Sequence, residues 1–252
     1  MFNSTHKIKP TLSVILITYN EEKNIAACLE SVRWADEIVL VDSGSEDQTA
    51  AIAQRFGVKV FQKNFAGYGS QKQYALEQAT GDWVLSLDAD ERITPELQAE
   101  ILEKIAQSDK VVGYEITRKN FIFGKWLKHA GLFPDYHLRL FRRHAGRFTP
   151  SLIHEGIEVE GKVQRCQNPI LHFTYPTIAS YIKRMNRYTE IIARQGCSFR
   201  FSHLFFSPLS KFFRLYLVRR GFRDGLRGFI YCILAAFYNF AKDAKIWEQK
   251  NR

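Results

Sequence analysis

The chain has 252 residues, of which 46% are hydrophobic and 25% charged, and its formal net charge is +10. This length suits one large domain, or one domain with an appendage. The sequence contains no internal repeat and no low-complexity tract. Four scattered cysteines, Cys28, Cys166, Cys197 and Cys232, have neither CxxC nor zinc-ligand spacing. They favour reduced thiols over a disulfide framework.

The charge is distributed unevenly along the chain. Residues 1–112 contain 11 Lys/Arg and 17 Asp/Glu, whereas residues 113–252 contain 25 Lys/Arg and 9 Asp/Glu. The second half is therefore suited to an anionic partner, such as nucleic acid, an anionic membrane surface or a phosphorylated substrate. Charge alone does not choose among these. The first 14 residues lack the apolar stretch of a secretion signal, so we expect a cytoplasmic location.

Apolar strand patterns alternate with helical patterns through the first half of the chain. Strands are predicted at 12–19, 37–44, 58–62 and 82–90, and helices at 22–35, 47–57, 70–81 and 95–107. This alternation is typical of βαβ units around a parallel sheet. Residues 111–175 are predicted to be mixed structure folding back over the sheet's edge. From 177 onward the pattern is helical, including "PLSKFFRLYLVRRG" and "GFIYCILAAFYNFAKDAKIWEQ".

Three predicted strands end in polar residues. These are Thr18-Tyr19-Asn20-Glu21, Asp42-Ser43-Gly44-Ser45 and Asp88-Ala89-Asp90. Parallel sheets bind ligands at the carboxyl ends of their strands, so we expect the three segments to form one site. Asp88 and Asp90 place two carboxylates on one side of the chain, a donor set suited to Mg²⁺ or Mn²⁺. The alternative for this DxD sequence is a surface turn with solvated acids.

The segments "SVILITYNEEKNI", "IVLVDSGSEDQT" and "GDWVLSLDADERI" resemble, in this order and spacing, the nucleotide-sugar domain of family 2 glycosyltransferases, which have the GT-A fold. The resemblance implies that the first two loops hold the base and ribose of a UDP-sugar donor, through Thr18, Tyr19, Asn20, Glu21 and Asp42. It also implies that Asp88 and Asp90 bind a divalent cation on the donor diphosphate, and that Lys72 lies near the base. Ser43 departs from the family pattern, which often has a second acid there.

Segments of the second half, among them "GLFPDYHLRLFRR", "LIHEGIEVEGKV" and "ILHFTYPTIASYIKRMNRYT", resemble the bacterial lipopolysaccharide inner-core subgroup of this family. That subgroup is similar to a β-1,4-glucosyltransferase acting on the first heptose. The predicted fold class is therefore α/β, a Rossmann-like GT-A fold with a mostly parallel sheet flanked by helices. We divide it into a nucleotide-sugar half (1–110), an acceptor-side mixed α/β part (111–176) and a helical, basic-aromatic appendage (177–252).

Inverting sugar transfer requires a general base that accepts the proton of the acceptor hydroxyl. The resemblance favours Glu155 in "IHEG", and Asp135 in "FPDYHLR" is the alternative; either acid would otherwise be a loop or turn residue. His172 is a candidate third metal ligand or diphosphate contact, and equally a core histidine with one hydrogen bond. His154 has the same two interpretations.

Arg139, Arg142 and Arg143 in "HLRLFRR" are candidates to clamp the donor diphosphate or an acceptor phosphate. Strand alternation puts Arg139 and Arg143 on one face and Arg142 on the other. The alternative for any one of them is a solvated basic strand.

Residues 183–227 contain 11 Lys/Arg and two acids, interleaved with Phe and Leu. This pattern predicts peripheral binding to the anionic inner face of the bacterial plasma membrane, where a lipid-linked lipopolysaccharide core acceptor would be found. The alternative is that the aromatic residues pack a small helical domain or a dimer contact. No nucleic-acid-binding motif is present, so we do not expect nucleic acid to be the partner.

Two other functions fit parts of the pattern, and a third is considered for completeness. Sugar transfer to a polyprenyl phosphate carrier uses a similar donor site, although such enzymes often have membrane-spanning helices. A haloacid-dehalogenase-type phosphatase also has Asp-x-Asp after a strand, but Arg92 occupies the position where that class usually has Thr or Val. A non-catalytic nucleotide-sugar binder has no feature in its favour.

Overall fold

The computed structural model describes residues 9–107, 110–149, 156–194 and 199–251. The chain divides into two compact units, one made of residues 1–117 and 136–171 and the other of 118–135 and 172–252. The strands β6 (Val111–Ile122) and β12 (Ile170–Tyr175) each begin in the first unit and end in the second. The three-part division at residues 110 and 176 stays a prediction.

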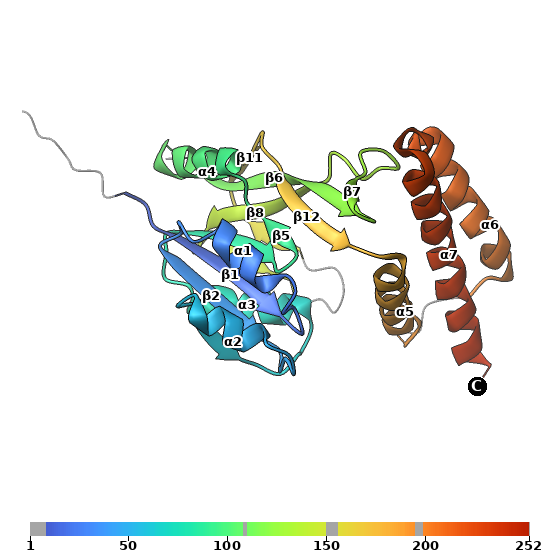
Figure 1. Ribbon diagram of the computed structural model, residues 1–252, viewed down its shortest axis with the longest axis horizontal. Coiled ribbons are helices and arrows are strands. Elements are labelled where there is room, and N and C mark those ends of the chain that lie inside the picture. The colour runs from blue at the N-terminus through green and yellow to red at the C-terminus, as the bar shows by residue number, and fades with distance from the viewer. Residues whose placement is uncertain (1–8, 108–109, 150–155, 195–198, 252) are drawn as a thin grey trace, which may run out of the picture. The chain divides into compact units, whose positions relative to one another are not determined.

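The first unit starts with alternating strands and helices (Figure 1). They are β1 (Leu12–Thr18), α1 (Ile25–Ser31), β2 (Glu37–Asp42), α2 (Thr49–Arg55), β3 (Lys59–Gln62), α3 (Tyr68–Gln78) and β4 (Trp83–Asp88). Then come β5 (Glu91–Arg92), α4 (Pro95–Gln107), β8 (Tyr136–Arg142), β9 (Gly146–Phe148), β10 (Ile157–Val159) and β11 (Lys162–Arg165). The elements alternate as the sequence predicts.

The main sheet is mixed, with the strand order β3-β2-β1-β4-β8-β6-β12-β5. The first four strands of this order pair in parallel, and β8 pairs antiparallel with β4 and β6. The predicted α/β fold with helices flanking a largely parallel sheet is thus confirmed, with this antiparallel pairing introduced by a strand that comes later in the chain.

Alternation along the strands gives the sheet two apolar faces. On one face, Val14 and Leu85 belong to a core that also contains Leu29 of α1 and Ile101 of α4. On the other face, Ile15 and Val84 pack with Ala75 and Leu76 of α3. Asp88 lies an even number of residues after Val84, so its side chain is on the α3 face.

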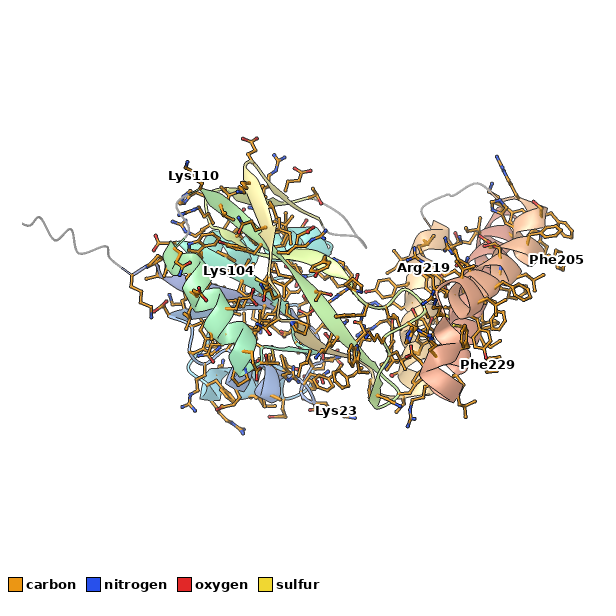
Figure 2. All side chains as sticks on the ribbon, turned by 90° about the horizontal axis from the view of Figure 1, so that it is seen from above. Lys23, Lys104, Lys110, Phe205, Arg219 and Phe229 are labelled. Carbon is orange, nitrogen blue, oxygen red and sulfur yellow. The ribbon has the colours of Figure 1, made fainter. Side chains whose placement is uncertain are left out.

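The second unit is mainly helical. It contains the short strand β7 (Lys125–Trp126), the helices α5 (Ile178–Arg194), α6 (Phe201–Phe213) and α7 (Gly225–Lys250), and between α6 and α7 a π-helical turn η1 (Arg214–Val218) and a 3₁₀ turn η2 (Gly221–Asp224). α6 lies alongside α7, and α5 also packs on α7 (Figure 1). Phe205 and Phe229 project from α6 and α7 (Figure 2).

The helix α6 starts earlier than the sequence predicts. The helix predicted at "PLSKFFRLYLVRRG" begins seven residues before that segment, at Phe201, so that Pro208 lies inside α6. Proline normally favours the first turn of a helix because it has no amide hydrogen to donate.

Within the described residues, no helix is both long enough and apolar enough to cross a membrane.

Candidate active site

Three polar strand ends meet at one edge of the sheet, as predicted. β1 lies between β2 and β4, and the register pairs Thr18 with Asp42 and Ile17 with Asp88. The chain passes from β1 to β2 on one side and returns to β4 on the other. Such a reversal of strand order is where open α/β sheets bind ligands.

Asp42 organises the loop that follows β2. Its carboxylate is buried and accepts hydrogen bonds from the Thr18 hydroxyl (2.9 Å), the Gly44 amide (3.1 Å) and both the amide and the hydroxyl of Ser45. Four donors match the lone pairs of one carboxylate. In this structure Asp42 therefore fixes the shape of the loop. Its contact with a base or ribose stays a prediction.

The loop after β1 presents one aromatic ring. Tyr19 is 46% exposed and directly follows the strand, a position compatible with the predicted stacking on a base. Asn20 has a positive φ of 56° and bridges to the second loop, since its amide donates to the Ser45 hydroxyl and its side-chain oxygen accepts from the Glu46 amide. The carbonyl of Glu21 accepts the amides of Asn24 and Ile25 at the start of α1.

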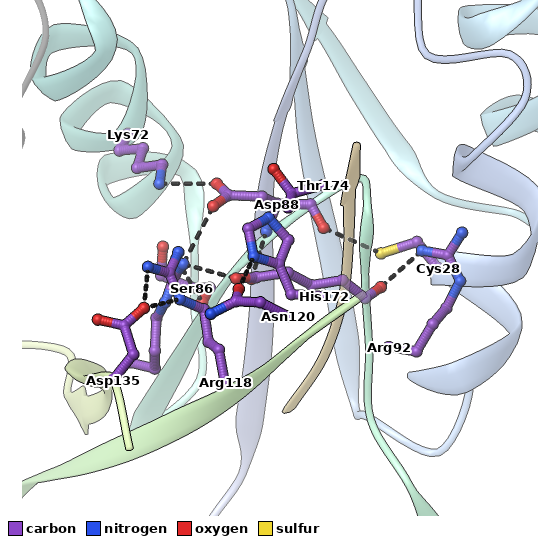
Figure 3. Close-up of polar contacts among 12 residues, drawn as sticks. Cys28, Lys72, Ser86, Asp88, Arg92, Arg118, Asn120, Asp135, His172 and Thr174 are labelled. Atoms are coloured by element: carbon purple, nitrogen blue, oxygen red, sulfur yellow. Dashed lines mark hydrogen bonds and ion pairs between the residues drawn. The ribbon is translucent and has the colours of Figure 1, made fainter. Parts of the chain in front are cut away.

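Asp88 is held between two cations, and Figure 3 shows its contact with the first of them, Lys72. The Lys72 ammonium, on α3, lies 2.8 Å from Asp88 Oδ1, and the Arg139 guanidinium, on β8, lies 3.0 Å from Asp88 Oδ2. Both cationic side chains are buried, whereas about a third (32%) of the Asp88 side chain is exposed. Burial disfavours the charged carboxylate, but Lys72 and Arg139 outweigh that effect and hold the pKa of Asp88 well below its usual range.

Glu91 completes this cluster, a role that local sequence reasoning misses. It is fully buried; its Oε1 lies 2.7 Å from Arg139 Nη2, and its Oε2 accepts the backbone amide of Asp88 at 3.0 Å. Glu91 thus orients Arg139 and also fixes the end of β4. The available signal is an acid three residues after Asp88, close enough along the chain to reach back to the strand end.

Arg142, another of the predicted clamps, is not brought to this cluster. It pairs in register with Trp83 at the start of β4, and its guanidinium lies 4.9 Å from the centre of the Trp83 ring. That position is at the opposite end of β4 from Asp88, roughly 16 Å away along the strand. Arg143 likewise lies at the start of β4, donating to the Gly81 carbonyl.

The other predicted residues belong to the second unit or lie outside the described residues. Asp135 accepts two hydrogen bonds from the Arg118 guanidinium, one of them at 3.0 Å from Nε. His172 is buried, with Nδ1 2.7 Å from Asn120 Oδ1, which is the hydrogen bond that a core histidine requires. Glu155 and His154 fall outside the described residues, so the choice of general base stays a prediction.

The family model for glycosyl transferase family 2 matches residues 13–189. The chain belongs to this family. It is therefore a glycosyltransferase, and the match runs through every strand end described above. The phosphatase interpretation of the DxD sequence is excluded by this membership.

Individual relatives extend over almost the whole chain of this glycosyltransferase. It is 36% identical to the lipopolysaccharide core biosynthesis glycosyltransferase LpsC of Rhizobium meliloti, over 96% of this chain and 93% of the relative. It is 29% identical to an uncharacterised glycosyltransferase of Rickettsia conorii, over 94% and 90%. Among solved structures, glucosyl-3-phosphoglycerate synthase of Mycobacterium tuberculosis, in complex with Mn²⁺, UDP and glucosyl-3-phosphoglycerate, superposes with a TM-score of 0.50 at 18% identity, covering 73% of this chain and 78% of that one. This superposition supports the GT-A fold.

The carboxylates at the end of β4 are chemically suited to a divalent cation. Among the described residues, no three His, Cys, Asp or Glu side chains are grouped closely enough to form a complete protein cage for a metal. Mg²⁺ and Mn²⁺ are often held by one or two carboxylates together with substrate phosphates and water. Because both oxygens of Asp88 are engaged by Lys72 and Arg139, Asp90, which is buried, is the better candidate for the direct ligand.

Proposed function

We propose that this glycosyltransferase moves a hexose, glucose from UDP-glucose, onto the heptose of the lipopolysaccharide inner core with inversion at the anomeric carbon. The relative LpsC, at 36% identity over almost the whole chain, supports the lipopolysaccharide core as acceptor. The observation that carries the proposal is the placement of Asp88 between Lys72 and Arg139 at the strand edge that also presents Tyr19.

The donor diphosphate is proposed to lie at this edge. Lys72 and Arg139 provide two buried positive charges beside the position where the leaving diphosphate gains negative charge. Charges fixed in advance in a site with little water stabilise such a transition state most effectively. Asp90, together with Asp88 in its predicted role, would hold Mg²⁺ or Mn²⁺. The ion would supply Lewis-acid stabilisation of the negative charge on the leaving diphosphate. His172 remains a proposed additional contact.

The acceptor hydroxyl is proposed to attack the anomeric carbon from the side opposite the leaving UDP. Glu155 or Asp135 accepts its proton. Asp135 is held in a fixed orientation by Arg118, and such a fixed carboxylate is suited to proton transfer once a hydroxyl lies within hydrogen-bond reach. The lipid-linked acceptor places the enzyme, in this proposal, on the inner face of the plasma membrane.

Release of UDP from UDP-glucose, with Mg²⁺ and lipopolysaccharide truncated after the first heptose, tests this proposal. We expect UDP release to require the cation, and Asp90→Asn to lower kcat/KM about a thousandfold. Glu103→Gln, which removes an exposed carboxylate from α4, is the control and should retain full activity. Undiminished, cation-independent UDP release by Asp90→Asn would refute the metal role.

Two further comparisons in the same assay sharpen the assignment. Of Glu155→Gln and Asp135→Asn, the variant that lacks the base should lose turnover while it still binds UDP-glucose.

A polyprenyl phosphate offered in place of the truncated lipopolysaccharide tests the competing acceptor. Faster UDP release with that carrier would replace the lipopolysaccharide proposal.

A further inference from the structure

The helix α6 exposes its most apolar side chains. Phe201, Phe205, Leu209 and Phe213 recur every four residues and, with Phe206, are between 53% and 71% exposed. At about 100° per residue, this spacing gives one stripe along the helix. The contact of α6 with α7 is on another side, where the Asn239 amide donates to the Ser207 hydroxyl at 2.9 Å. The stripe therefore faces away from α7.

A second exposed apolar stripe runs along α7. Leu226, Phe229, Ile233, Phe237 and Phe240 follow a spacing of three and four residues and are 38% to 73% exposed. The buried side chains of this helix, such as Cys232 and Ala235, lie on a different face. A surface helix of a globular protein typically has one apolar stripe, which faces the core. α7 has a second apolar stripe, which is exposed.

The two stripes meet at the turn between the helices. The ring of Phe229 on α7 contacts Phe212 at 6.0 Å and Tyr216 at 5.6 Å between centroids, and Tyr216 also contacts Phe222 at 6.1 Å. These edge-to-face contacts join α6, η1, η2 and α7 into one apolar surface, from which Phe205 and Phe229 project in Figure 2.

The same turn carries a set of exposed arginines: Arg214, Arg219, Arg220, Arg223 and Arg227. No ion pair joins any of the five to an acid of the described residues. The acid in their midst, Asp224, is engaged instead by His129, through the ring nitrogen at 2.9 Å and the backbone amide at 2.8 Å. Burial together with the positive charges of Arg214 and Lys242 lowers the pKa of Lys211, as expected where positive charge accumulates.

We propose that this basic-aromatic surface, formed by the exposed faces of α6, η1, η2 and α7, binds the interface of an anionic lipid bilayer. The Phe and Leu side chains enter the boundary between headgroups and acyl chains, and the arginines bind lipid phosphates. The inference rests on the proposed function only in placing a lipid-linked acceptor at the same membrane.

Other occupants fit the surface less well. A second copy of the chain in a two-fold contact would bring the same arginines face to face. A nucleic acid would use the arginines but would leave two long aliphatic and aromatic stripes in water. A bilayer with anionic lipids meets both features at once, because it offers apolar chains beneath phosphate groups.

Flotation of the full-length protein with vesicles tests the proposal. We expect binding to vesicles of phosphatidylethanolamine and phosphatidylglycerol, and weak binding to phosphatidylcholine vesicles. Arg214→Gln/Arg223→Gln should lower the partition coefficient roughly 25-fold, at about fivefold per arginine. Phe205→Ser/Phe206→Ser should lower it by about tenfold or more, since both exposed rings leave the interface.

Matched controls remove the same groups from the first unit. Lys23→Gln/Arg33→Gln removes two exposed positive charges, and Phe65→Ser removes a ring that is 42% exposed. Both should bind vesicles as wild type does. The proposal is overturned if wild type ignores anionic vesicles, if the surface variants bind as well as the controls, or if light scattering shows a dimer that Phe205→Ser/Phe206→Ser dissociates while vesicle binding is unchanged.

UDP release with a soluble, lipid-free core oligosaccharide separates this inference from the proposed function. The surface variants should release UDP at the wild-type rate from that acceptor, because none of these residues belongs to the donor site. Wild type that floats with anionic vesicles but releases no UDP would refute the proposed function and leave the membrane surface standing.

Discussion

Charged groups are arranged in opposite ways in the two units. At the sheet edge of the first unit, Lys72, Asp88, Glu91 and Arg139 form ion pairs of 2.7 to 3.0 Å and three of the four are buried. At the turn of the second unit, five exposed arginines lie in the same segment of the chain as exposed aromatic residues. A buried charge must be paired within the fold. An exposed charge is stabilised by water and remains available to an external partner. In the two proposals above, the paired charges belong to the reaction site and the exposed arginines to the membrane-binding surface.

The largest expected effect comes from breaking the pairing in the first unit. Glu91→Gln removes a carboxylate that balances the buried charge of Arg139, and we expect a loss of about 3 kcal/mol in the free energy of unfolding. We also expect kcat/KM for UDP-glucose to fall about tenfold or more, because Arg139 loses its orientation. Urea unfolding and the UDP-release assay measure the two effects.

A double variant distinguishes positioning from simple stability. Glu91→Met/Arg139→Met replaces the buried pair by apolar side chains and should recover much of the stability. Activity should not recover, since the guanidinium beside Asp88 is gone. Full activity in Glu91→Gln, with only stability reduced, would show that Glu91 has no part in positioning Arg139.

A somewhat smaller and pH-dependent effect is expected at Glu37. Burial disfavours its charged carboxylate, but Lys59 at 2.6 Å, the Ser13 hydroxyl and the Thr80 amide outweigh that cost and lower its pKa from 4.5 to about 2. A lowered folded-state pKa contributes stability above pH 4.5 that disappears as the pH falls toward 2. Glu37→Gln should therefore cost up to about 3 kcal/mol at pH 7.

Thermal or urea unfolding of both proteins across this pH range checks the sign. The difference between wild type and Glu37→Gln should be constant from about pH 7 to about pH 5 and then shrink toward about pH 2. Glu22→Gln, an exposed residue of the same unit, is the control and should show a small difference throughout. A difference that grew with acidity would contradict the linkage.

The smallest expected effect concerns the turn of the second unit. A Cβ at Gly228 would overlap the Gly221 carbonyl oxygen, so Gly228→Ala must push η2 away from α7. Overpacking of this kind costs about 1–3 kcal/mol, partly offset by the better helix propensity of alanine, about 1 kcal/mol. We expect the free energy of unfolding, measured in urea, to fall by about 1 kcal/mol, and vesicle binding to weaken. Ala241→Gly, which lowers helix propensity and removes one half-buried methyl group on the same helix, should leave vesicle binding unchanged. A stabilised Gly228→Ala would contradict the close contact.

Local sequence patterns predict the fold of the first unit well. Apolar runs correspond to the strands, and α4 spans 95–107 as predicted from Thr94 and Pro95. The polar strand ends are predictable for the same reason, since parallel strands bring their carboxyl ends to one edge. The predictions of the donor and the acceptor come from the family resemblance and not from local sequence pattern.

The partners of Asp88 are beyond the reach of local pattern. Arg139 comes from β8, 51 residues later in the chain, and its pairing with Asp88 depends on the antiparallel insertion of β8 beside β4. Sequence reasoning leaves Glu91 without a role because its second contact is that same arginine. In α6, an interior proline hides seven residues of helix from a pattern that takes proline as a helix start.

The late arrival of Arg139 has a consequence for how the chain folds. A nascent chain that has reached only residue 107 contains the complete βαβ segment with Asp88, Asp90 and Glu91, but not the arginine that Asp88 and Glu91 share. Until β8 pairs with β4, Asp88 can pair with the Lys72 ammonium, but Glu91 lacks its ion pair with Arg139, and this opposes the burial of the Glu91 carboxylate. We therefore expect the pairing of β8 with β4 and the completion of this charged cluster to occur together, so that the end of β4 acquires its final form only when β8 is in place.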